Sequence, residues 1–178
     1  ACMDISRRCY FFFQKGQLGA QPTGITCKVQ EVNKLSFINN QVYPDGRENL
    51  VLDACNNCVI EGNNFKSYYN GILVLNGNDN TVNKNIFWLT GAVQNQLLDH
   101  GDDFGIINVK GNNNMVTSNS LSCEWAYAGA VTVNAVQGTG NVFKNCFVDN
   151  LESYRVFLVN AQTEVSNCVS SDKVSIVE

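Results

Sequence analysis

An asparagine recurs in one short frame along most of this chain, and this recurrence constrains the fold more than any other feature. In five of six occurrences an apolar residue lies three positions before the asparagine and another lies two positions after it. In the sixth, Glu164 replaces the first apolar residue. The separations are 23, 22, 34, 26 and 22 residues, and repeats of this length are typical of solenoids. The residues are Asn40, Asn63, Asn85, Asn119, Asn145 and Asn167.

A second set of segments lies between the asparagines. Large apolar residues alternate there with smaller or polar ones, which indicates strands with one buried face. The segments are ITCKV, NLVLD, GILVLNG, GIINVKG, AVTVN and RVFLV. Two short strands in each repeat of about 22 residues, without helical periodicity, predict an all-β fold, a parallel β-helix of about seven coils.

Stacked coils explain why a strand-rich chain repeats a residue that strands disfavour. Equivalent residues of neighbouring coils lie about 4.8 Å apart. A side-chain amide can then donate a hydrogen bond to the amide on one side and accept one from the other. We therefore predict a structural asparagine ladder that satisfies buried polar groups where the backbone bends.

Length and composition predict one domain over residues 1–178. Charged residues make up 16% of the chain and the net charge is −4, which argues against a nucleic-acid partner. No apolar stretch is long enough to span a membrane, so we expect no membrane partner. The sequence begins in the middle of a coil without a cap, and we expect it to lack N-terminal coils of the solenoid.

Eight cysteines do not form the pattern of a disulfide framework. Cys146 and Cys168 each follow a repeat asparagine, so we expect them to stack as small core residues. Cys55 and Cys58 form a single CxxC without a second pair, and we predict no metal site. Cysteine usage leaves the cellular compartment open.

One repeat is longer than the others, and functional residues of solenoids are expected at such irregularities. The gap of 34 residues predicts an inserted loop over residues 88–103. It contains Asp99, His100, Asp102 and Asp103, a dense group on a weakly charged chain. The alternative is a solvated loop in which Asp102 caps the next strand.

Two further irregularities supply candidate residues. In VYPDGREN a Pro-Asp-Gly turn accounts for Asp45 but not for Arg47. The pair Gln30 and Glu31 interrupts an apolar strand, so we expect one of the two to face inward or to lie at a subunit contact.

Carboxylates on neighbouring coils would suit carbohydrate chemistry. Stacking places them at multiples of about 4.8 Å, close to the separations of roughly 5 to 9.5 Å that glycosidases use. Asp4, in the first partial coil, is expected at a strand position comparable to that of Asp53.

The order of several segments resembles the C-terminal half of inulin fructotransferase, the enzyme family that forms difructose dianhydride. The resemblance covers most of the chain and includes the YPDGR turn and the acidic loop before GIINV. It lies in GRENLVLDACNNCVIEGNNF, YYNGILVLNGNDNTVNKNIF, LLDHGDDFGIINVKGNNNMVTSNSL and VFLVNAQTEVSNCV. It implies a right-handed parallel β-helix that forms homotrimers, with active sites between subunits and without metal or cofactor. The implied reaction releases difructose dianhydride from β-2,1-fructan by intramolecular fructosyl transfer, or hydrolyses such a product, and a secreted bacterial protein is favoured over a cytoplasmic one.

The resemblance also implies site residues. The glutamate of the family falls on Gln30, with Glu31 adjacent, so the chain is either a divergent member or a variant in which an amide replaces the acid. We predict catalytic roles for Glu31, Gln30 and Asp103. Predicted substrate-binding residues are Arg47, Asp45, Asp99, His100, Asp102 and Asp4. The alternative function is a non-catalytic trimeric stalk or a glycan-binding segment like a phage tailspike.

Overall fold

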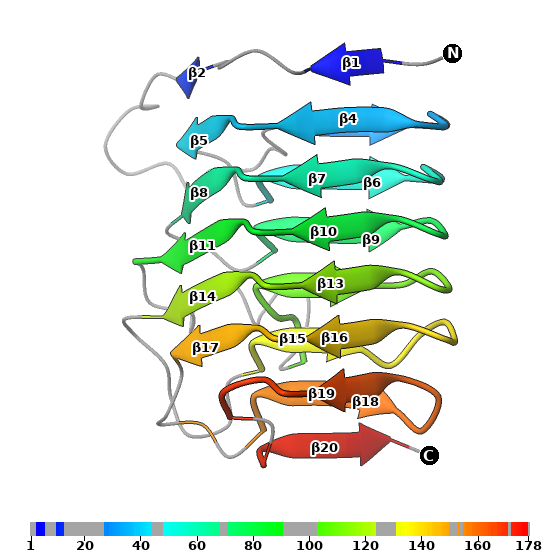
Figure 1. Ribbon diagram of the computed structural model, residues 1–178, viewed down its shortest axis with the longest axis vertical. Coiled ribbons are helices and arrows are strands. Elements are labelled where there is room, and N and C mark those ends of the chain that lie inside the picture. Colours follow the sequence, from blue (N-terminus) through cyan, green and yellow to red (C-terminus); the bar gives the residue numbers. More distant parts are fainter. Residues whose placement is uncertain are drawn as a thin grey trace.

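The chain winds through three parallel sheets that run along one axis (Figure 1). For residues 3–5, 10–12 and 43 only the backbone is described. In the described part no helix is long and apolar enough to cross a membrane. The computed structural model describes residues 3–5, 10–12, 27–43, 48–67, 71–90, 103–123, 131–149, 153, 155–170 and 172–177.

Each coil contributes one strand to each sheet in turn. Sheet A consists of β1 (Met3–Ile5), β4 (Leu35–Ile38), β7 (Val59–Glu61), β10 (Thr81–Asn83), β13 (Met115–Thr117), β16 (Val142–Lys144) and β19 (Glu164–Ser166). Sheet B consists of β2 (Tyr10–Phe12), β5 (Gln41–Tyr43), β8 (Asn64–Ser67), β11 (Ile86–Leu89), β14 (Ser120–Cys123) and β17 (Phe147–Asp149). Sheet C consists of β3 (Cys27–Gln30), β6 (Leu50–Asp53), β9 (Leu73–Asn76), β12 (Ile107–Val109), β15 (Val133–Ala135), β18 (Phe157–Asn160) and β20 (Val174–Val177).

The predicted parallel β-helix is confirmed. Neighbouring strands in every sheet come from successive coils and are parallel, as the pairing of β6 with β9 and of β9 with β12 illustrates. The sheets contain seven, six and seven strands among the described residues. The number of complete turns is therefore slightly smaller than the seven predicted.

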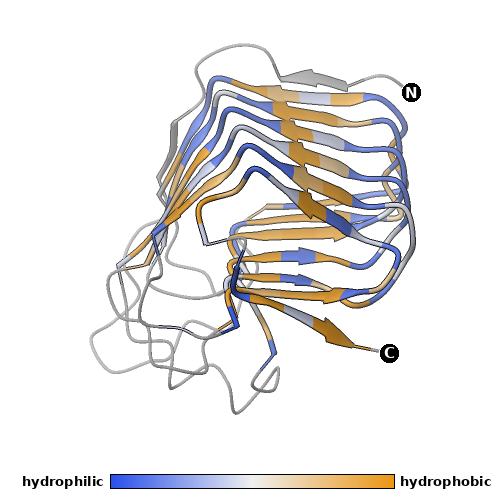
Figure 2. Ribbon diagram, turned by 60° about the horizontal axis from the view of Figure 1, so that its bottom comes forward, coloured by the Kyte–Doolittle hydropathy of each residue, from blue (hydrophilic) through white to orange (hydrophobic). Residues whose placement is uncertain are grey.

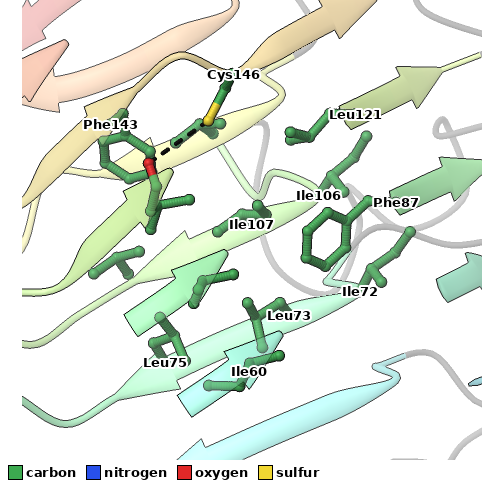
Figure 3. Packing of buried hydrophobic residues seen from close by; sticks show 14 of the residues in the cluster. Ile60, Ile72, Leu73, Leu75, Phe87, Ile106, Ile107, Leu121, Phe143 and Cys146 are labelled. Atoms are coloured by element: carbon green, nitrogen blue, oxygen red, sulfur yellow. Dashed lines mark hydrogen bonds between the residues drawn. The ribbon is translucent and has the colours of Figure 1, made fainter. Parts of the chain in front are cut away.

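The interior of the solenoid is filled by rows of apolar side chains. Hydrophobic and hydrophilic residues form bands across equivalent positions of successive coils (Figure 2). The rings of Phe65 and Phe87 stack with centroids 5.0 Å apart, and Phe37 continues the row at 6.1 Å. Figure 3 shows part of this core, including Ile60, Phe87 and Leu121, all of which are buried. Burial of apolar surface at roughly 25 cal/mol per Å² supplies the main driving force for folding.

The asparagine ladder is confirmed at the bend between sheets A and B. The Asn63 side-chain Oδ1 accepts from the backbone N–H and the side-chain amide of Asn40, at 2.8 and 3.0 Å. Asn63 makes the same two bonds to Asn85, and Asn85 makes them to Asn119. The last pair is separated by 34 residues, so the long repeat forms a coil like the others.

The predicted ladder positions Asn145 and Asn167 are wrong by one residue. They have φ values of 55° and 50°, the left-handed conformation that asparagine tolerates better than most residues. The residues that follow them, Cys146 and Cys168, occupy the ladder positions. The Cys146 backbone N–H donates to the Cys168 sulfur at 3.4 Å, and the Cys146 thiol donates to the carbonyl of Val116 (dashed in Figure 3). Both cysteines are buried and free, so the predicted stacking of these cysteines as core residues is confirmed.

A second ladder, which the sequence analysis missed, lies between sheets C and A. The Asn114 Oδ1 accepts from the side-chain amide of Asn80 at 2.9 Å, and Asn141 accepts from Asn114 at 3.1 Å. Cys58 begins this row, because its backbone N–H donates to Asn80 Oδ1 at 2.9 Å. These asparagines end the segments GNDN, GNNN and GTGN, and such clusters of glycine and asparagine are also typical of simple turns.

The predicted loop at 88–103 begins later than expected. β11 continues to Leu89, where it pairs with Cys123 of β14, so the strand includes the first two residues of the predicted loop. Residues 91–102 lie outside the described part of the chain.

Replacing Asn85 by alanine should destabilise the protein strongly. The substitution removes the amide that bonds to Asn63, Asn119 and the carbonyl of Ile60, and it leaves buried groups without partners. We expect the free energy of unfolding in urea to fall by about 2–4 kcal/mol. The matched control is Asn64→Ala, on the outer face of β8, with an expected change within about 0.5 kcal/mol. Equal effects of the two substitutions would contradict the importance of the ladder.

Candidate functional site

The variable connections of the coil join sheet B to sheet C. From β4 to β17, consecutive strands of sheets A and B are separated by only two residues, as between β10 and β11, whereas 5 residues separate β8 from β9 and 17 separate β11 from β12. Binding and catalytic residues are often carried by such loops on a rigid scaffold. Predicted site residues in these connections are Asp45, Arg47, Asp99, His100 and Asp102, which lie outside the described residues. The two segments that contain these residues both connect sheet B to sheet C, and they belong to coils that are two apart in the stack.

Asp103 is the acidic residue of the long connection that the structure describes. Its carboxylate Oδ1 lies 2.6 Å from Nη1 of Arg155. Its backbone carbonyl accepts a hydrogen bond of 2.7 Å from the side chain of Asn134 in β15. These two contacts attach the end of the connection to the next two coils.

Arg155 was missed by the sequence analysis. It lies two residues before β18, and the strand pairings of sheet C place it in one row with Val131, Gly105 and Gly71 of the preceding coils. Only 22% of its side chain is exposed. An arginine among glycine and valine is a signal of function that becomes visible only when the coils are aligned in register.

A cavity of about 160 Å³ opens beside Asp103. It lies on the outer face of sheet C, because Asn108 and Asn134 alternate with inward-facing core residues of β12 and β15. The outer positions equivalent to Asn134 in other coils include Val74 and Leu158, and both are buried. The outer face of sheet C is therefore covered at those two residues and open at Asn134, which is half-buried. The cavity is lined by Asp103, Phe104, Asn108, Lys110, Asn134, Val136 and Gln137.

A glycine permits the aromatic wall of this cavity. Gly71 has a φ of 75°, and a methyl group there would lie 2.6 Å from the Phe104 ring and 3.1 Å from Cγ of Glu48. The missing side chain therefore lets Glu48 and Phe104, from coils two apart, lie against the same glycine. The Cγ of Glu48 thus lies near the aromatic residue of the cavity wall.

A second polar cluster lies at the other end of the sheet C strands. Asp53 Oδ2 accepts from the Gln30 amide at 2.8 Å and lies 3.2 Å from the Lys28 ammonium, and its Oδ1 accepts from Asn76 at 2.7 Å. The Gln30 hydrogen bond, followed by those of Lys28 and Asn76, lowers the pKa of Asp53 below its usual range. Asp53 is therefore held as a carboxylate and has no proton to donate as a general acid.

Neither Gln30 nor Glu31 faces inward, because both are exposed and Glu31 leaves the strand with a φ of 55°. Of the two placements expected for this pair, the inward one is therefore wrong, and the subunit contact stays a prediction. Asp4 is not equivalent to Asp53. It lies in β1 of sheet A, opposite Ser36, whereas Asp53 belongs to sheet C.

The predicted catalytic residues do not meet within one chain. Gln30 and Glu31 lie at the end of β3, and Asp103 precedes β12. The strands β6 and β9 lie between them, which corresponds to three inter-strand steps, or roughly 14 Å. Glycosidase carboxylates act as a pair at roughly 5 to 9.5 Å, so Glu31 and Asp103 of one chain cannot form such a pair.

The CxxC residues belong to the core. The thiols of Cys55 and Cys58 lie 3.4 and 3.8 Å from the carbonyl oxygens of Val29 and Val32, in the preceding coil. Among the described residues, no group of three or more histidine, cysteine, aspartate or glutamate side chains is arranged to hold a metal ion.

The fold agrees with comparisons to known proteins. The family model described as the right-handed β-helix region matches residues 23–176, so the chain belongs to that family. The structure is similar to the crystal structure of DFA-IIIase from Arthrobacter chlorophenolicus without its lid, with a TM-score of 0.71 and 22% sequence identity. This similarity covers 88% of the chain and 42% of the DFA-IIIase chain, so the sequence spans less than half of that protein. A search of curated protein sequences found no match.

The hydrogen bonds of Asp53 should make stability depend on pH. Because its folded-state pKa is lowered, the stabilisation is fully present above the unfolded value of about 3.9 and is lost as the pH falls through the lower folded value. The loss of unfolding free energy caused by Asp53→Asn should therefore be larger at pH 6 than at pH 2.5, as measured by urea unfolding. Gln30→Ala, which removes the first of the donors, should reduce this pH dependence in part. If the loss of unfolding free energy caused by Asp53→Asn did not change with pH, these contacts would not be stabilising the charged form of Asp53.

Proposed function

We propose that this chain is part of a carbohydrate-active β-helix enzyme that acts on β-2,1-fructan or on a difructose dianhydride derived from it. The observation that carries the proposal is the cavity beside Asp103, whose carboxylate is anchored by Arg155 on the outer face of sheet C. The similarity to DFA-IIIase over 88% of the chain supports the choice of substrate class.

The proposed reaction is an intramolecular fructosyl transfer. A substrate hydroxyl attacks the anomeric carbon, and the bond from that carbon to the departing sugar oxygen breaks. A carboxylic acid protonates the departing oxygen, and a base accepts the proton of the attacking hydroxyl. Asp103 is suited to orient and deprotonate that hydroxyl, since Arg155 holds its carboxylate at the cavity wall. In the hydrolytic variant of the reaction, water replaces the attacking hydroxyl.

The acid must come from elsewhere. Glu31 lies roughly 14 Å from Asp103 along the axis and can act beside it only when a neighbouring subunit supplies it. A homotrimer with sites between subunits would provide this arrangement. Within the same chain, Glu48 is an alternative among the described residues, because its Cγ lies against Gly71, as the Phe104 ring does.

A second candidate is a glycan-binding β-helix that does not cleave its ligand. It is favoured by the cluster around Asp53, where Gln30 is an amide and the carboxylate is occupied by donors from the two neighbouring strands, β3 and β9. Such a protein needs the ladder and a polar outer face but no acid. The other non-catalytic alternative, a trimeric stalk, would not require the cavity.

The two candidates differ in their products. With inulin or difructose dianhydride as substrate, we expect thin-layer chromatography to show conversion, and Asp103→Asn should lower the rate by about 10²–10⁴-fold because the base is lost. The control is Asp149→Asn, on the exposed face of β17, which should leave the rate unchanged. Sedimentation should give the same mass for all three proteins. Unchanged substrate with the wild-type protein would favour the glycan-binding alternative, and full activity of Asp103→Asn would remove Asp103 from the mechanism.

A further inference from the structure

We propose that the cavity between β12 and β15 is a binding site for one ring of a neutral sugar, and that Lys110 and Gln137 are the side chains that select it. The inference rests on the proposed function for the class of ligand. It does not require cleavage, because binding can be measured alone.

Two of the polar side chains in the cavity are already occupied by the protein. Asn108 Oδ1 accepts from the backbone N–H of Gly105 at 2.9 Å, and its amide donates to the Gly105 carbonyl at 2.8 Å. Asn134 donates to Asp103 and accepts from the backbone N–H of Val136 at 3.2 Å. The side-chain hydrogen-bonding groups of these two asparagines are therefore used within the protein, and we assign them to the cavity wall and not to ligand recognition.

Two other polar side chains remain available. Lys110 and Gln137 are exposed, and neither side chain makes a hydrogen bond or ion pair in the part of the chain that the structure describes. Lys110 directly follows β12, and Gln137 follows β15 by two residues, so neighbouring coils present them together. An ammonium and an amide that line a cavity without partners are suited to receive a polar ligand.

The chemistry of the free groups points to hydroxyl groups on the ligand. Lys110 can only donate hydrogen bonds, whereas the Asp103 Oδ2 that Arg155 leaves free can only accept them. A ligand must therefore accept from one wall and donate to the other, which hydroxyl groups do and a carboxylate or sulfate group does not. Phe104 adds an apolar surface for the carbon-bound hydrogens of a ring.

The size of the cavity limits the ligand to one ring. Its volume of about 160 Å³ equals the share of roughly five water molecules. A single sugar ring can replace these waters with its own hydroxyl groups, whereas a second ring must extend beyond the cavity. Gly71 maintains this space indirectly, because it leaves room for the Phe104 ring at the wall.

Binding can be tested by titration calorimetry and ligand-observed NMR with fructose and an inulin-type trisaccharide, and with acetate as an anion that carries no hydroxyl group. We expect the neutral sugars to bind and acetate to bind at least tenfold more weakly, because acetate cannot donate a hydrogen bond to Asp103. Lys110→Ala and Gln137→Ala should each raise the Kd for the trisaccharide at least tenfold. Lys144→Ala on β16 and Gln162→Ala after β18 are matched controls and should leave the Kd unchanged, and thermal unfolding should confirm that every variant folds.

The outcomes separate this inference from the proposed function. Binding that depends on Lys110 and Gln137 without any cleavage would support the site and refute the enzyme. Cleavage of fructan with a Kd that neither substitution changes would support the enzyme and overturn the site. Absence of binding by every neutral sugar, or tighter binding of acetate, would also overturn it.

Discussion

The structure depends on hydrogen bonds between buried amides of successive coils. Asn63 and Asn85 each accept two bonds from the preceding coil and donate two to the following one, so a shift of one coil by a single residue would leave several buried groups without partners. Buried polar groups lower the free energy of unfolding when they are unpaired, and a network of them stabilises the fold strongly when every group has a partner. The ladder therefore sets the register of the coils, and the apolar rows of the core follow from that register.

The fixed register of the coils determines which side chains meet at the candidate site. Asp103 and Arg155 are 52 residues apart in sequence, yet they meet because their coils are stacked two apart. From β4 onward the bend between sheets A and B keeps a constant length of two residues, whereas the connections from sheet B to sheet C vary widely in length. Chemical diversity is therefore confined to one edge of the solenoid, and the anchored carboxylate and its cavity lie beside that edge.

The two polar clusters on sheet C differ in what they leave available. Around Asp53 the donors and acceptors satisfy one another, and their hydrogen bonds connect three coils. Around Asp103 the asparagines are satisfied, but a carboxylate oxygen, an ammonium and an amide still face a cavity. A closed network stabilises a surface, whereas an open one can exchange its water for a ligand. This contrast is the physical basis for our proposal that a ligand binds at Asp103 and not at Asp53.

The fold could be predicted from the sequence because periodicity is a local property that repetition amplifies. Asn40, Asn63, Asn85 and Asn119 recur with apolar neighbours, and stacking is the arrangement that satisfies all of them. The register of the last coils could not be predicted, because asparagine suits both the left-handed position of Asn145 and the ladder position that Cys146 occupies. Of the candidate site, Asp103 was found by its place in an irregular repeat, but Arg155 and Lys110 were not, since single cations carry no pattern. The repeat thus determined that the chain forms a stack of coils, while only the tertiary structure decided which side chains meet on its surface, because those contacts depend on the register between coils and not on neighbours in sequence.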